Sequence, residues 1–256
     1  MYIVVVADAS AAQLHDVVYV AGSDKTILRF SATTHEPLTN IDIQDMGQPR
    51  DIVACEQTSQ LYVADREMCV WRVSTDGTDI LRWLLLSYTC KPFKLSVTST
   101  RLLVTFRDTR QLRQVDADGD ELRRVQLPDH MELHHAVESP TGTFIVSLEN
   151  TQLKQWQVVE VNTGDEVLRQ FSGPRLTSFG VTPHVAVAVD SHGNVLVADA
   201  DNRQILLLDD HLSLRRIIIE EHQLSSSELH RLCYREQSGE LLVGYNAGCV
   251  MCFVVT

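Results

Sequence analysis

The stretch that decides the fold is Pro183–Asp209, PHVAVAVDSHGNVLVADADNRQILLLD. Apolar residues alternate as VAVAV at 185–189, and the turn-forming run DSHGN separates them from a second apolar run, VLVAD at 195–199. Alternation with a period of two predicts a β-strand, and a Gly-Asn turn between two such runs predicts a hairpin. A further turn leads into a third apolar run, ILLL at 205–208. This stretch therefore predicts three consecutive antiparallel strands.

The second of these strands has counterparts along the whole chain. Six similar apolar runs follow one another at intervals of about 40 to 50 residues, at Val17–Ala21, Leu61–Asp65, Leu102–Thr105, Phe144–Ser147, Val195–Asp199 and Leu241–Gly244. A repeat of this length with strands in each unit is typical of propellers, in which neighbouring sheets bury one another. The sequence predicts an all-β chain: residues 1–256 form one six-bladed β-propeller of four-stranded antiparallel blades.

The first strand of each blade is expected to line the central channel. The predicted channel strands are Ile3–Ala7, Asp51–Cys55, Lys94–Thr98, Ala136–Ser139, Val185–Asp190 and Arg231–Arg235. The third strand of the fourth blade is predicted at Leu153–Trp156. After Val250–Phe253 no fourth strand follows within the 256 residues. The last blade is therefore three-stranded, or completed by the N-terminal strand Tyr2–Val6, or completed by natural chain beyond residue 256. An open ring would expose a sheet edge, which favours closure by the N-terminal strand.

Composition limits the class of protein. The chain of 256 residues is 44% hydrophobic and 22% charged, which is typical of a globular protein with a substantial core. It contains no apolar run approaching the ~20 residues that a membrane span needs, and its six cysteines are expected to be thiols. A formal net charge of −12 disfavours DNA as a partner. We expect a cytoplasmic protein that does not bind membranes.

The pattern VAVDxxGNVLVADxxNRQI in the fifth blade resembles an NHL repeat, and PRDIVA followed by LYVAD in the second blade resembles it less closely. The resemblance implies a six-bladed propeller similar to the NHL domains of tripartite-motif proteins, which bind protein partners or RNA. Related propellers include the peptide-amidating lyase and gluconolactonase-like enzymes. Since one propeller scaffold carries unrelated activities, function has to be argued from the site.

Loops at the start of each channel strand, and those joining second to third strands, should converge at the mouth of the channel. The residues there predicted to bind a partner are Arg50, Arg66, Arg107, His134, His135, Asn150, His184, Asn202 and His230. The favoured hypothesis is a non-catalytic interaction module that binds a protein or peptide and needs no cofactor.

Two alternatives stay open. The basic segment 91–124 suggests RNA binding through Lys91, Lys94, Arg101, Arg107, Arg110 and Arg113. Imidazoles at one level of neighbouring blades resemble, in position, the three-His zinc site of the amidating lyase. The candidate ligands are His134, His135, His184 and His230. A zinc ion held by three of them would leave an open position for lyase or hydrolase chemistry.

Overall fold

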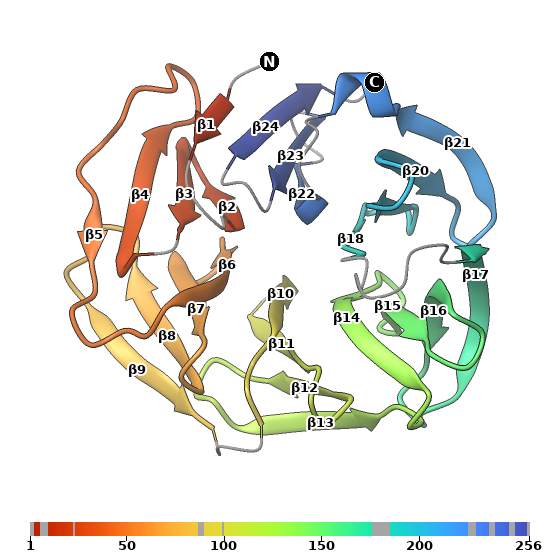
Figure 1. The fold of residues 1–256 in the computed structure, drawn as a ribbon. Coiled ribbons are helices and arrows are strands. Elements are labelled where there is room, and N and C mark those ends of the chain that lie inside the picture. Colours follow the sequence, from red (N-terminus) through yellow and green to blue (C-terminus); the bar gives the residue numbers. More distant parts are fainter. Residues whose placement is uncertain are drawn as a thin grey trace.

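The computed structural model describes residues 3–5, 10–22, 24–86, 90–98, 100–175, 185–224, 229–235, 239–245 and 249–254. Six four-stranded antiparallel sheets stand around a central axis as the blades of a propeller (Figure 1). The described residues contain one short 3-10 helix, Glu221–Gln223, and none of their helices is long and apolar enough to cross a membrane. The predicted fold class is confirmed.

The strands of each blade are given from the axis outwards. Blade one has β2 (Ser10–Leu14), β3 (Val17–Ala21), β4 (Thr26–Ser31) and β5 (Ile41–Asp42). Blade two has β6 (Pro49–Cys55), β7 (Gln60–Asp65), β8 (Cys69–Ser74) and β9 (Ile80–Leu85), and blade three has β10 (Lys94–Thr98), β11 (Arg101–Phe106), β12 (Gln111–Val115) and β13 (Glu121–Gln126).

Blade four has β14 (Met131–Glu138), β15 (Phe144–Asn150), β16 (Gln155–Val161) and β17 (Val167–Arg175). Blade five has β18 (Val187–Val189), β19 (Val195–Asp199), β20 (Gln204–Leu208) and β21 (Leu214–Ile219), and blade six has β22 (Leu229–Arg235), β23 (Glu240–Tyr245), β24 (Cys249–Val254) and β1 (Ile3–Val5). The last blade thus takes three strands from the C-terminal end and its outer strand from the N-terminal end.

The ring closes where β1 pairs with β24, with Ile3 opposite Met251 and Val5 opposite Cys249 (Figure 1). The expected closure by the N-terminal strand is confirmed, but the prediction of Ile3–Ala7 as a channel strand is wrong. Ser10–Leu14 takes that place in blade one. Its Ala11 and Ala12 are small and buried, which suits the narrow space near the axis.

A second correction concerns blade four. Its third strand begins at Gln155 and continues to Val161, whereas Leu153 and Lys154 lie in the preceding turn. Lys154 has φ +50°, a left-handed backbone conformation that fits a turn and not a strand. The predicted strand Leu153–Trp156 was therefore placed too early.

The core fills the spaces between neighbouring blades. Second strands are buried on both faces, as Val63 and Ala64 on β7 show, because these neighbours point to opposite faces and neither has exposed surface. On one side Val63 packs with Ile27 of blade one, within the same apolar cluster as Trp71. Burial between blades explains why these strands were the clearest signal in the sequence.

Candidate functional site: the two ends of the central channel

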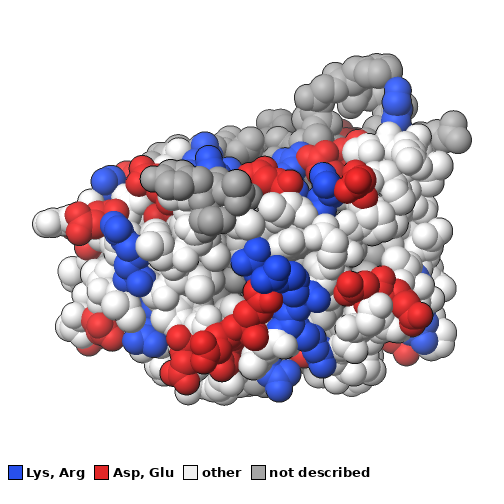
Figure 2. Space-filling view, turned by 90° about the horizontal axis from the view of Figure 1, so that it is seen from below, with Lys and Arg blue, Asp and Glu red and all other residues white. Residues whose placement is uncertain are grey.

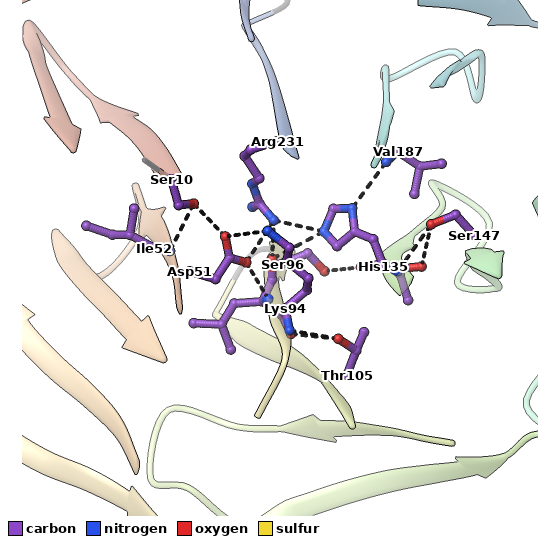
Figure 3. Close-up of polar contacts among 12 residues, drawn as sticks. Ser10, Asp51, Ile52, Lys94, Ser96, Thr105, His135, Ser147, Val187 and Arg231 are labelled. Carbon is purple, nitrogen blue, oxygen red and sulfur yellow. Dashed lines mark hydrogen bonds and ion pairs between the residues drawn. The ribbon is translucent and has the colours of Figure 1, made fainter. Parts of the chain in front are cut away.

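A buried polar cluster crosses the channel near the starts of the innermost strands (Figure 3). At its centre Asp51, which has no exposed surface, accepts hydrogen bonds from Arg231 Nη1 at 2.9 Å, the Leu95 N–H at 2.7 Å and Ser10 Oγ at 2.5 Å. The ammonium group of Lys94 lies 3.7 Å from the same carboxylate. These contacts tie blades one, two, three and six together at the axis.

The charges of this cluster follow from its geometry. Burial alone would raise the pKa of Asp51, but the nearby Arg231 and Lys94 outweigh burial and bring that pKa down to about 2. Burial lowers the pKa of Lys94 to about 8, against the opposing attraction of Asp51. At neutral pH one carboxylate therefore faces two cations.

His135 extends the cluster to blades four and five. Its Nδ1 accepts the Val187 N–H at 3.2 Å, so the ring proton of the neutral imidazole is assigned to Nε2, which donates to Leu95 O at 3.3 Å. Arg231 Nη1 lies 3.0 Å from Nε2. Burial and then the charge of Arg231 lower the pKa of His135 to about 3, so this side chain is neutral at pH 7.

Two serine hydroxyls add contacts between blades at the same level. Ser96 Oγ donates to Ala136 O at 2.8 Å, and Ser147 Oγ donates to Val185 O at 2.5 Å (Figure 3). We call the set Ser10, Asp51, Lys94, Ser96, His135, Ser147 and Arg231 the axial plug. Through these bonds all six innermost strands are connected directly at the axis.

Beyond the axial plug, the channel widens into a cavity of about 650 Å³, here called the channel cavity. Its walls are the later halves of the innermost strands, with Val53, Val137 and Val187 among the apolar residues. It extends to the turns that join first to second strands, where Glu56 and Asp190 line it. We call this end of the propeller the turn face.

The opposite end, the mouth face, carries a group of arginines. The guanidinium groups of Arg50 and Arg107 lie 5.2 and 5.4 Å from the centre of the Phe93 ring, a cation–π arrangement. Arg107 also hydrogen-bonds Glu132. The pKa of Arg50 is lowered by burial and next by the charge of Arg66. Arg50, Arg66 and Arg107 are here called the arginine cluster.

Other residues predicted for the mouth face have structural contacts. Asn202 donates from Nδ2 to Asp199 at 2.7 Å. The Asn150 carboxamide oxygen accepts the Leu153 N–H. Each contact stabilises the loop in which the asparagine lies. His134 and His135 are each only 2% exposed, so a partner on the surface does not reach them. His184 and the side chain of His230 lie outside the described residues.

The basic residues of blade three do not form a purely positive surface. Lys94 is buried in the axial plug. Arg110 pairs with Asp129 at 2.8 Å, and Glu121 lies between Arg113 and Arg124. Figure 2 shows the rim from the side of β13, where Lys and Arg side chains form a stripe that adjoins Asp and Glu side chains. The paired acids reduce the positive charge that an RNA backbone would meet here.

The contacts of His135 also argue against its predicted role as a zinc ligand. Both ring nitrogens of His135 are engaged within the axial plug, and a guanidinium group lies beside them. In the part of the chain that the structure describes, the possible ligand atoms of Asp209, Asp210 and His211 lie within 4.8 Å of one another, close enough to hold a metal ion. Asp209 there accepts backbone N–H bonds within its own turn, which accounts for its presence without a metal.

Sequence reasoning missed Arg231 and Phe93 as site residues, and it treated Asp51 only as the start of a strand. A usable signal was present. Channel strands that are otherwise apolar carry a charged or polar residue near their start, as in DIVA at 51–54 and HHAV at 134–137. A charged residue in a buried strand needs a partner, and the start of a channel strand is where six blades can supply one.

No protein-family model matches the sequence, and a search of curated proteins gave no match. Solved structures do resemble it. The β-propeller domain of Cps50 (Swd1) from Myceliophteria thermophila is 12% identical with a TM-score of 0.64, over 96% of this chain and 83% of that one. A Bacteroides caccae protein of unknown function is 13% identical, with a TM-score of 0.67, over 90% and 83%.

A chain of the mitotic checkpoint complex is 12% identical with a TM-score of 0.66, over 95% of this chain and 74% of that one. Identities this low show a shared propeller fold and nothing further. The resemblance to NHL repeats is not confirmed by a family model, so the family within the propellers stays a prediction.

Proposed function

We propose that this protein is a non-catalytic interaction module whose mouth face binds an acidic segment of a protein or peptide partner. The observation that carries the proposal is the arginine cluster around Phe93. The guanidinium groups of Arg50 and Arg107 lie beside one phenyl ring although these residues are 57 positions apart in the sequence, and the charge of Arg66 acts on Arg50. Arginine and aromatic residues are the types that contribute most to protein interfaces.

The electrostatics of the cluster favour an anionic partner. The pKa of Arg50 is lowered by burial, by Arg66 and to a smaller extent by Arg107, with Asp108 acting in the opposite direction. Like charges held together in this way gain from a carboxylate that bridges them, and a planar guanidinium can bind one through two parallel hydrogen bonds. Phe93 adds an apolar surface beside the charges.

Neighbouring contacts hold the cluster in place before a partner binds. Arg50 Nη1 donates to Pro92 O at 3.4 Å, and Arg107 is fixed by Glu132. The backbone of Arg66 is held by its N–H bond to Gln48 O at 2.9 Å. Side chains that are ordered in advance lose less conformational entropy on binding.

A pull-down from the source organism's lysate tests the proposal, with bound proteins quantified by mass spectrometry. The double variant Arg50→Ala/Arg66→Ala is compared with wild type and with Arg101→Ala. Arg101 is a matched control because its half-exposed side chain pairs with Glu138 near the turn face. We expect a partner that wild type and the control recover equally and that the double variant recovers at least about tenfold less. Equal recovery of every protein by all three would refute the proposal.

A further inference from the structure

We propose that the channel cavity is a binding site for a small organic carboxylate with an apolar body, and that Arg231 anchors the carboxylate. This site lies on the far side of the axial plug from the arginine cluster. It is independent of the proposed protein-binding face.

The first observation is the incomplete hydrogen bonding of Arg231. Its side chain is 7% exposed, and among the described residues its hydrogen bonds come from Nη1, which contacts Asp51, Leu95 O and His135 Nε2. Nε is buried without a hydrogen-bond partner among the residues that the structure describes. A buried donor of this kind calls for an explanation, because nearly all such groups in proteins are paired.

The geometry of guanidinium identifies what would satisfy it. Nε and Nη2 lie on the same edge of the plane, and this edge is the one that binds a carboxylate through two parallel hydrogen bonds. Arg231 is among the residues that line the channel cavity. Nη1 of Arg231 is thus committed to Asp51. We place the ligand carboxylate at the opposite edge, whose Nε is buried in the free protein and has to turn towards the cavity when the ligand binds.

The charges around Arg231 also favour an anion. Arg231 and Lys94 face one carboxylate, that of Asp51, and His135 is neutral at pH 7. A ligand carboxylate would add a negative charge beside Arg231, whose side chain is 7% exposed. Charged hydrogen bonds are stronger in such surroundings than at a surface.

The walls and the open end define the rest of the ligand. Val53, Val97 and Val137 offer an apolar lining, and the cavity volume of about 650 Å³ lies in the range of small-molecule sites. At the open end the lining includes Glu56, Glu138 and Asp190, and the Glu138 carboxylate also accepts a hydrogen bond from Gln114 Nε2 at 2.7 Å and pairs with Arg101. A ligand with a positive group at its far end would fit best.

The length of that ligand follows from strand geometry. From His135 to Glu138 the chain advances three residues along β14, which is about 10 Å at ~3.3 Å per residue. A carboxylate and an ammonium group joined by a short alkyl chain bridge this distance with a hydrogen bond at each end. The ligand class is therefore a small zwitterion of the type of 6-aminohexanoate.

Three probes of the same chain length separate the contribution of the carboxylate from that of the ammonium group. They are 6-aminohexanoate, hexanoate and hexylamine, each titrated into the protein in a calorimeter. We expect 6-aminohexanoate to bind most tightly, hexanoate next and hexylamine least. Equal binding of hexylamine and 6-aminohexanoate, or no binding of either carboxylate, would overturn the proposal. Equal binding of the two carboxylates would support the anchor and overturn the role given to the acidic end.

Two variants locate the site. Arg231→Lys keeps a positive charge opposite Asp51 but lacks the two-pronged edge, so it should weaken hexanoate binding at least about tenfold. Glu138→Gln should remove the preference for 6-aminohexanoate over hexanoate and leave hexanoate binding unchanged.

If Arg231→Lys does not fold, the assigned Nε–H resonance of Arg231 in ¹⁵N-labelled wild-type protein decides. A shift of this resonance on addition of hexanoate supports the anchor. An unchanged resonance at saturating hexanoate overturns it.

Discussion

Replacing Asp51 by Asn tests whether the axial plug stabilises the propeller. The carboxylate has no exposed surface and receives three hydrogen bonds, one of them from Arg231. Asn keeps the shape but places an NH₂ group where one oxygen accepted hydrogen bonds, and it removes the negative charge that faces Arg231 and Lys94. Breaking a buried ion pair by changing one partner costs about 3–5 kcal/mol. In a chain of this size that corresponds to a fall of roughly 10 °C in the unfolding midpoint.

The acid stability of the wild type gives an independent estimate. The pKa of Asp51 falls from 3.8 to about 2 on folding, which corresponds to about 2 kcal/mol. Because the folded pKa is the lower one, this stabilisation is present above pH 4 and is lost as the pH falls towards 2. Asp51→Asn should flatten the stability curve in that interval.

The assay is thermal unfolding followed by circular dichroism, with Asp129→Asn as control. The pair Arg110–Asp129 has an N–O distance of 2.8 Å, against 2.9 Å for Arg231–Asp51, but the Asp129 side chain is 94% exposed. Exposed pairs contribute little, so the control should melt close to wild type. A midpoint for Asp51→Asn equal to that of the control would refute the reasoning.

Four further predictions follow from the fold and the plug. The folded pKa of His135 is about 3, below its ordinary 6.5, so stability in urea should fall as pH drops from 6.5 to 4, and less steeply in His135→Asn; equal slopes would contradict this. Gly173→Ala should lower the free energy of unfolding by about 1–3 kcal/mol in denaturant titrations, because a methyl group there would overlap the buried Trp156 ring. Deleting residues 1–5 should lower the melting temperature and cause association detectable by light scattering, since β24 would become an exposed edge. Elemental analysis of untagged protein should find far less than one zinc per chain, and stoichiometric zinc lost in His184→Ala would show this expectation to be wrong.

The parts of the fold that could be predicted are those fixed by local pattern. Second strands such as Leu61–Asp65 are apolar because they are buried between blades, and this can be recognised without knowing the neighbours. The channel strand Ser10–Leu14 could not be recognised in this way. Its run SAAQL has weak strand preference, and it is held in place by contacts with the channel strands β6 and β22 of the two neighbouring blades.

The candidate site likewise has a part that local sequence pattern predicts and a part that it does not. Arg50, Arg66 and Arg107 were placed at the mouth face from their positions before or after strands, and the structure brings them to that face. The axial plug depends on contacts such as Asp51 with Arg231, which are 180 residues apart. A single sequence shows that each is a charged residue in an apolar strand but not which partner it has.

The pairing of β1 with β24 has a consequence for the order of assembly. Ile3 is opposite Met251, so closing this contact joins residues 248 positions apart, at a loop-closure cost of about 5 kcal/mol. Blades one to five can form one after another as the ribosome extends the chain, but β1 has to wait until its partner strand has been made. The closure of the ring is therefore expected to follow synthesis of β24. Until then β1 is an unpaired strand of the nascent protein, a segment that a chaperone could recognise.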